Sequence, residues 1–148
     1  MFTGDTVGIY YRELTEFGVE LYLPSTSPTQ FQPDVMLKSK ERIKSLNVDC
    51  IYFGHYGAST NVSEVYRQLE FGVPLFFKTG KEIFETEADS VTAKNKLANS
   101  LFEIVQSHLT QQGIPTTYSI YEDILKLEMD VNAKGIIHYL TQLKLGLA

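Results

Sequence analysis

The stretch Cys50–Gly57 constrains the fold more than any other part of the chain. Its apolar and aromatic residues, followed by Gly54, are typical of a short β-strand buried on both faces. The strand ends at this glycine and leaves the imidazole of His55 beyond its carboxyl end, where Gly57 lets the backbone turn away. Because ligands of open α/β sheets bind at the carboxyl ends of strands, His55 is a candidate metal ligand or general base. An isolated Gly-His-x-Gly more often places its histidine against a loop carbonyl, and that alternative stays open here.

A second strand end precedes this one at the start of the chain. Met1–Thr3 is followed by Gly4 and Asp5, so an acidic side chain occupies the position that His55 occupies fifty residues later. Between them lie, in order, a loop rich in proline, serine and threonine (Leu23–Phe31), a helix around Ser39, and Asn47–Asp49 leading into the second strand. In this order, the segments resemble the second half of the metallo-β-lactamase superfamily of metal-dependent hydrolases. The resemblance covers about residues 1–60.

The resemblance implies a fold, a metal site and a reaction. Residues 1–60 would form half of an αββα sandwich of α/β class, and residues 61–148 a helical extension packed on it, one domain overall. Asp5 would bridge two divalent metal ions, zinc by default and manganese or iron as alternatives, and His55 would be the last ligand of the second metal. A metal-bound hydroxide would attack a carbonyl or phosphoryl centre of a small-molecule substrate, whose identity the resemblance leaves open.

The chain also departs from this family. The upstream His-x-His-x-Asp-His motif is absent, and the chain has three histidines, His55, His108 and His138. Two metals need more imidazoles than this, so we expect a C-terminal portion of a hydrolase that is inactive alone. The uncovered sheet predicts a homodimer or a complementary N-terminal fragment as partner. A non-catalytic dimerisation or interaction module is the alternative function.

Three further residues are weaker site candidates. Tyr10 and Tyr11 follow Asp5 closely and could line a substrate pocket, or could be exposed aromatics of a loop. The helix that carries Ser39 is expected to have Pro33 in the first turn, and Met36, Ser39 or Lys40, Ile43 and Leu46 recur in it at helical spacing. Ser39 thus falls on the expected buried face and could support the metal site, although small hydroxyl residues there usually allow close packing.

Periodicity predicts mostly helix after residue 60. A strand is expected over Val19–Leu23. One helix is expected to begin after Gln32, and another after an Asn61 cap, with a break or kink at Gly72–Pro74. A third is expected over about Val91–Gln112 after Asp89 or Ser90, with an apolar stripe of Leu97, Leu101, Ile104, Val105 and Leu109. Two shorter helices are expected over about Ser119–Glu128 and Val131–Leu145, with Asp130 or Asn132 as the cap between them. The pattern leaves residues 75–85 undecided. His108 and His138 fall within these helices and are expected to be structural or exposed.

Composition excludes several function classes. The formal net charge is −5, and no basic cluster of the kind that binds phosphate backbones occurs, so nucleic acid is not an expected partner. A single cysteine, Cys50, in the expected buried strand favours a reducing cytoplasm. No apolar run approaches the ~20 residues of a membrane span, and no signal peptide is visible.

Overall fold

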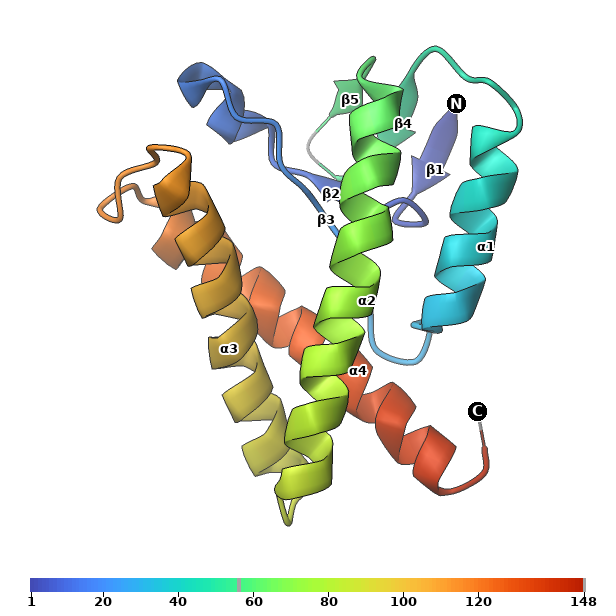
Figure 1. The fold of residues 1–148 in the computed structure, drawn as a ribbon, viewed down its shortest axis with the longest axis vertical. Coiled ribbons are helices and arrows are strands. Elements are labelled where there is room, and N and C mark those ends of the chain that lie inside the picture. The colour runs from blue at the N-terminus through green and yellow to red at the C-terminus, as the bar shows by residue number, and fades with distance from the viewer. Residues whose placement is uncertain (56, 148) are drawn as a thin grey trace. The chain divides into compact units, whose positions relative to one another are not determined.

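The computed structural model describes residues 1–55 and 57–147 and has a mixed α/β fold (Figure 1). Tyr56 of the stretch introduced above lies outside the described residues. Helices are long and strands short in this chain. In order, the elements are β1 (Phe2–Gly4), β2 (Ile9–Tyr10), the 3₁₀ helix η1 (Arg12–Phe17), β3 (Tyr22–Leu23), α1 (Pro33–Lys44), β4 (Ile51–Phe53), β5 (Ala58–Ser59), α2 (Val62–Thr86), α3 (Ser90–Gln111), the π-helix η2 (Tyr121–Leu125) and α4 (Lys126–Lys144).

The strands form two small sheets. The larger has the order β1-β4-β5, with β1 parallel to β4 and β5 antiparallel to it. The smaller pairs β2 with β3 in antiparallel orientation. The expected α/β class is therefore confirmed at the level of a mixed fold, and the strand predicted over Val19–Leu23 is limited to its last two residues.

β4 has one buried face and one exposed face. Ile51 and Phe53 are buried, whereas Tyr52 is 43% exposed and stacks on Phe2, which is 83% exposed. The prediction of a strand buried on both faces is wrong, because side chains alternate between faces and only one face of β4 reaches the core. Cys50 precedes the strand and is partly exposed, so its predicted burial is wrong as well.

The chain divides into two compact units. The first contains Met1–Ser25 and Gln32–Leu75, and the second contains Thr26–Phe31 and the chain from Phe76 onward. Each unit draws on two separate segments of sequence. The division predicted at residue 60 stays a prediction.

An aromatic cluster forms the core of the first unit. Tyr10 of β2 stacks on Tyr22 of β3 with ring centroids 4.8 Å apart, and both rings lie 5.8 Å from Phe53 of β4. The hydroxyl oxygens of Tyr22 and Ser59 are 2.8 Å apart, which satisfies a polar group inside this core. The cluster ties the two sheets of the unit together.

Of Ser39 and Lys40, which share one position in its apolar period, α1 buries Lys40 more fully. Pro33 occupies its first turn as predicted, and Met36 and Ile43 are buried. Lys40 is buried with them, whereas Ser39 is half-buried, so the expected burial of Ser39 is only partly met. The helix ends at Lys44, and Leu46, which was expected on the buried face, is exposed beyond that end.

α2 is one helix from Val62 to Thr86, with Pro74 inside it. The break at Gly72–Pro74 is therefore absent and the alternative, a kink, stays a prediction, while residues 75–85, which the sequence left undecided, are helical. A proline removes one hydrogen bond from a helix without forcing it to end. Gly72 is needed for packing, since a Cβ there would lie 3.1 Å from the ring of Pro24.

α3 matches its prediction within a residue at either end. Asp89 caps it, because its carboxylate accepts hydrogen bonds from the backbone N–H groups of Val91 and Thr92 at 3.0 and 2.9 Å. Four members of the predicted apolar stripe, Leu97, Leu101, Val105 and Leu109, are buried, and the fifth, Ile104, is half-buried. Ala93 is buried as well, and the helix packs on α4 within the second unit.

The two predicted C-terminal helices are one continuous helical segment, since η2 runs directly into α4. The cap predicted at Asp130 or Asn132 is therefore wrong. Asp130 pairs instead with Lys94 of α3 at 2.5 Å. The buried amide oxygen of Asn132 accepts a hydrogen bond of 2.8 Å from the backbone N–H of Thr26. The side chain of Asn132 thus binds a segment that is distant in the sequence and does not cap a helix.

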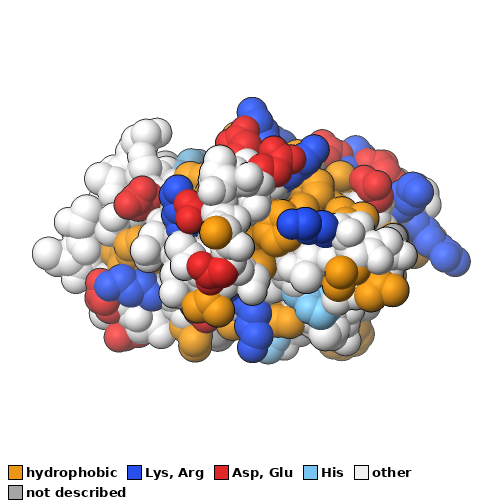
Figure 2. Space-filling model, turned by 90° about the horizontal axis from the view of Figure 1, so that it is seen from below, with side chains coloured by type: hydrophobic (Ala, Val, Ile, Leu, Met, Phe, Trp, Pro, Cys, Tyr) orange, Lys and Arg blue, Asp and Glu red, His pale blue; other side chains and the backbone are white. Residues whose placement is uncertain are grey.

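On the face drawn in Figure 2, lysine and arginine side chains are mixed with acidic ones, and hydrophobic side chains lie between them. None of the helices in residues 1–55 and 57–147 combines the length and the apolar character that crossing a membrane requires.

Candidate functional site

The parallel pairing of β1 with β4 builds the candidate site. Phe2 lies opposite Tyr52 and Gly4 opposite Phe53, so both strands end at the same edge of the sheet. The N–H of Gly54 donates a 3.1 Å hydrogen bond to the carbonyl of Gly4, which extends the pairing to the last position of each strand. The residue that follows Gly4 and the residue that follows Gly54 therefore leave the sheet at the same edge, where ligand-binding residues of parallel sheets are found.

Asp5 and His55 are those two residues, and the structure brings them together. The Nε2 atom of His55 lies 3.6 Å from the Oδ1 atom of Asp5, and both side chains are partly exposed. An imidazole and a carboxylate at this distance can share a metal ion, or can form an ion pair when the imidazole is protonated. The pair joins positions fifty residues apart in the sequence.

Gly54 controls the approach of the two side chains. A Cβ at this position would lie 2.7 Å from Oδ1 of Asp5 and 3.3 Å from the backbone of Gly4. Any larger residue would therefore push the carboxylate from its position beside the imidazole. This glycine is required for space, since its φ angle lies outside the left-handed region.

The chain turns back into the core directly after Asp5. The N–H of Gly8 donates to the carbonyl of Asp5 at 3.0 Å and closes a tight turn. Gly8 has φ of +87°, and a Cβ there would lie 2.3 Å from the carbonyl oxygen of Leu23. The turn thus fixes the backbone that carries Asp5 against the β2–β3 sheet.

The other predicted site residues lie in different surroundings. Tyr10 and Tyr11 are buried, so the alternative of exposed loop aromatics is wrong. Their burial gives both rings a packing role, and a part in a substrate pocket stays a prediction. Ser39 lies on α1 beside Lys40, and its support of a metal site also stays a prediction.

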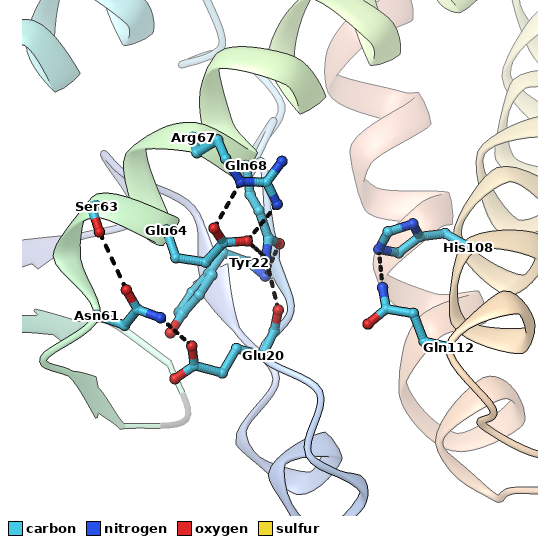
Figure 3. Close-up of polar contacts among 9 residues, drawn as sticks. All are labelled: Glu20, Tyr22, Asn61, Ser63, Glu64, Arg67, Gln68, His108 and Gln112. Carbon is cyan, nitrogen blue, oxygen red and sulfur yellow. Dashed lines mark hydrogen bonds and ion pairs between the residues drawn. The ribbon is translucent and has the colours of Figure 1, made fainter.

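The two remaining histidines are in helices of the second unit, as expected. His108 is exposed on α3, where its Nε2 atom lies 2.6 Å from the side-chain nitrogen of Gln112 (Figure 3). His138 is half-buried on α4. Among the residues that the structure describes, no three His, Cys, Asp or Glu side chains gather closely enough to hold a metal.

A polar network at the start of α2 was hardly visible in the sequence (Figure 3). Gln68 is its centre: its amide nitrogen donates to the carbonyl of Glu20 and to the carboxylate of Glu64, both at 2.7 Å, and its amide oxygen accepts from the N–H of Tyr22 at 2.8 Å. Asn61 donates to Glu20 at 2.5 Å. In the sequence, the spacing of Asn61 and Glu64 was the one pattern that indicated polar contacts at this helix start. The network holds β3 against α2, and its satisfied groups indicate a structural role.

Electrostatics within this network favour an ionised Glu64. Its carboxylate receives two hydrogen bonds from Arg67, at 2.7 and 2.5 Å. The guanidinium lowers the pKa of Glu64 below its ordinary value, and the hydrogen bond from Gln68 adds to the effect, while partial burial opposes it.

Comparison of the chain with protein-family models, with curated proteins and with solved structures gives no match.

Proposed function

We propose that this chain is the C-terminal portion of a metal-dependent hydrolase of the metallo-β-lactamase superfamily, with Asp5 and His55 as metal ligands. One observation carries the proposal: a carboxylate and an imidazole leave the carboxyl ends of two neighbouring parallel strands with 3.6 Å between Oδ1 and Nε2. The sequence resemblance requires these two residues at two such strand ends.

The two side chains fit a metal as part of its ligand set. Zinc bonds of about 2.0–2.1 Å to nitrogen and about 2.0–2.2 Å to carboxylate oxygen, at a tetrahedral angle, separate the ligand atoms by about 3.3–3.5 Å. The observed separation of 3.6 Å is close to this value. Two ligands are fewer than a catalytic zinc needs, so the other ligands would come from a partner sequence.

Each residue has a defined task in this proposal. Asp5 would bridge two divalent metals and partly neutralise their charge, and His55 would complete the ligands of the second. Gly54 keeps the space between them open. When bound, the metals would supply Lewis-acid activation of water for hydrolysis. Zinc is the first choice, and manganese or iron also suits a mixed carboxylate and imidazole site.

The proposed fold is half of an αββα sandwich. A half-sandwich leaves one sheet face and one strand edge uncovered, and β1 lies at the edge of its sheet. A complementary N-terminal portion with a His-x-His-x-Asp-His motif would cover both and would complete the ligand set.

The coding sequence before Met1 and the longer protein test this function. We expect an in-frame His-x-His-x-Asp-His motif, and in the protein that contains it Asp5→Ala should abolish turnover of ester, lactone or phosphodiester substrates. His55→Ala should remove the second metal selectively, as measured by elemental analysis, whereas His138→Ala should leave metal content and turnover unchanged. If Asp5→Ala and His55→Ala both retain full metal content and turnover, the assignment of these positions is wrong.

A second candidate function is an interaction module that forms a homodimer. It is favoured by the exposed, stacked pair Phe2 and Tyr52 beside the edge strand β1. Two such faces related by a two-fold axis would bury each other's aromatic rings. Sedimentation should then detect a dimer that Phe2→Ser with Tyr52→Ser converts to a folded monomer, and a wild-type monomer at high concentration would exclude this function.

A further inference from the structure

The carboxyl edge of the β1–β4 pair continues toward β5, one strand beyond the candidate ligands. The strand order β1-β4-β5 places Asp5 after β1, His55 after β4, and Gly57 directly before β5. The carbonyl of Gly57 accepts a 3.0 Å hydrogen bond from the N–H of Phe53, so Gly57 lies beside the end of β4. A side chain placed over Gly57 is therefore a neighbour of the candidate ligands along this edge.

Arg12 is that side chain. A Cβ built at Gly57 would lie 3.7 Å from the Cδ atom of Arg12, which is ordinary contact distance. The backbone of Arg12 is held in place, since its carbonyl accepts a 2.7 Å hydrogen bond from the hydroxyl of Thr15 and the flanking Tyr11 and Leu14 are buried. The structure thus fixes the origin of the arginine side chain beside the candidate site.

A small molecule can contact both Arg12 and His55. The Cδ atom of Arg12 lies within about 5.2 Å of the Cα atom of Gly57, because the added Cβ is one bond of about 1.5 Å from that Cα. Gly57 follows His55 by two residues, so their Cα atoms are at most about 7.6 Å apart. The guanidinium and the imidazole both extend from these points, which leaves a span of a few bonds between them.

The charge of Arg12 is available to a ligand. Its side chain is exposed and forms no ion pair with any side chain of residues 1–55 and 57–147. Glu13 and Glu16 line a surface hollow with it, but neither carboxylate pairs with the guanidinium. Burial raises the pKa of Tyr10, Glu20 adds to the rise and Arg12 opposes it, so the positive charge of Arg12 acts close to β2.

We propose that Arg12 binds an anionic group, a carboxylate or a phosphate, of the substrate whose reacting group lies at Asp5 and His55. This inference rests on the proposed hydrolase and names its substrate class, a small molecule with a negative charge a few bonds from the scissile centre. The planar guanidinium presents parallel N–H donors that match such a group. Arg12 contacts the substrate away from the reacting atoms, so it sets affinity and selectivity.

Binding of succinate to the isotopically labelled chain in the presence of zinc, followed by NMR at constant ionic strength, tests the assignment. One carboxylate would bind the zinc at Asp5 and His55, and the other would bind Arg12. Butyrate has the same four carbons and a single carboxylate. We expect succinate to bind about 3- to 10-fold more tightly than butyrate, because it gains a charge-assisted contact.

Variants of Arg12 separate this contact from general charge effects. Arg12→Gln should remove the advantage of succinate, and Arg12→Lys should retain part of it, since lysine keeps the charge without the paired donors. Arg42→Gln, at an exposed position of α1, is the matched control and should retain the full advantage. Because the Arg12 side chain is exposed and its carbonyl still accepts the Thr15 hydrogen bond, Arg12→Gln should fold.

The two ends of the site are measured separately. 3-Phosphonopropionate replaces one carboxylate of succinate by a phosphonate, and the tighter of the two compounds identifies the preferred anion. If zinc perturbs the His55 imidazole but succinate has no advantage over butyrate, or keeps it in Arg12→Gln, the role of Arg12 is wrong and the proposed metal site stands. If zinc leaves His55 unperturbed, the proposed function fails, and a saturable shift of the Gly57 amide that Arg12→Gln removes would then support anion binding by Arg12 alone.

Discussion

At the scale of single residues, Gly54 sets the distance between the two candidate ligands. A methyl group there would collide with Oδ1 of Asp5 at 2.7 Å, and the exposed carboxylate can escape by rotating outward. Stability should therefore change little, since the entropy that alanine removes from the unfolded chain offsets part of the collision.

We predict that Gly54→Ala alters the free energy of unfolding by less than ~1 kcal/mol and weakens zinc binding by about tenfold. Urea unfolding and zinc titration measure the two quantities on the same sample. Unchanged zinc affinity in this variant would mean that the position of Asp5 does not matter for metal binding.

The buried phenol of Tyr22 makes the free energy of unfolding depend on pH. Burial raises the pKa of its phenol well above the usual value near 10, and the hydrogen bond with Ser59 opposes this shift in part. The folded chain therefore keeps a proton that the unfolded chain loses above pH ~10. Stability from this group is complete below pH ~10 and is lost as pH rises further.

We predict that the free energy of unfolding falls above pH ~10 with a slope to which Tyr22 contributes up to ~1.4 kcal/mol per pH unit. In Tyr22→Phe the slope should be smaller by that contribution, as urea unfolding between pH 8 and 11 can show. At pH 8 the variant should lose about 1 kcal/mol with the Ser59 hydrogen bond. Equal slopes in both proteins would contradict the buried phenol as the source.

The candidate ligands Asp5 and His55 could be predicted from the sequence, whereas the ion pair of the buried Lys40 could not. Asp5 and His55 each follow a glycine at the end of an apolar run, which is a local pattern. The apolar period of α1 includes Ser39 and Lys40 at one position, but the ion pair that accompanies the burial of Lys40 is made by Glu70, thirty residues away. The hydroxyl of Tyr66, which is buried without a hydrogen-bond partner among residues 1–55 and 57–147, likewise depends on contacts that a local pattern does not encode.

At the scale of elements, α2 illustrates how packing overrides a local signal. Gly72 and Pro74 together are typical of a helix end, yet the helix continues to Thr86. Gly72 admits the ring of Pro24, and the buried side chains Leu69, Val73 and Phe76 hold the helix on both sides of the proline. A helix anchored in this way tolerates the loss of one backbone hydrogen bond.

We predict that Pro74→Ala stabilises the chain by about 1–2 kcal/mol. Alanine restores the N–H group that proline lacks, and the greater freedom of the unfolded chain offsets part of that gain. Pro74 is exposed, so little packing is lost. Urea unfolding monitored by circular dichroism measures the change, and a less stable variant would show that the proline ring is needed.

The segment Thr26–Phe31 is attached to α4 by buried polar contacts. Thr26 donates through its backbone N–H to the side chain of Asn132 at 2.8 Å and through its hydroxyl to the carbonyl of Asn132 at 2.7 Å. Gly135 allows the approach, since a Cβ there would overlap the carbonyl oxygen of Thr26 at 1.5 Å. These residues lie more than one hundred positions apart, so the helix prediction for this region treated Asn132 as a cap.

We predict that Asn132→Leu costs about 1–3 kcal/mol, because the backbone N–H of Thr26 would remain buried without its acceptor. Asn95→Leu, at an exposed position of α3, is the matched control and should stay within ~0.5 kcal/mol of wild type. Chemical denaturation of both variants makes the comparison. Equal costs would argue against a special role for the buried amide.

At the scale of the whole molecule, the predictable features were those encoded within a few residues. Apolar periodicity located α1 and α3, and Asp89 marked the start of α3. The mixed α/β class followed from two strand ends and a long helical remainder. The assignment of Thr26–Phe31 to the second unit and the continuity of α4 were missed, because both depend on contacts between distant segments.

The metal site is the central claim, and a zinc titration of the chain tests it most directly. NMR signals of the three imidazoles report which histidine binds the metal, with Asp5→Asn and His55→Gln as test variants and His138→Gln as control. We predict that zinc perturbs the His55 imidazole first, with weak affinity because two ligands hold it. Asp5→Asn should reduce this affinity by at least about tenfold. A zinc response confined to His108 or His138, or one that is unchanged in Asp5→Asn, would contradict the site.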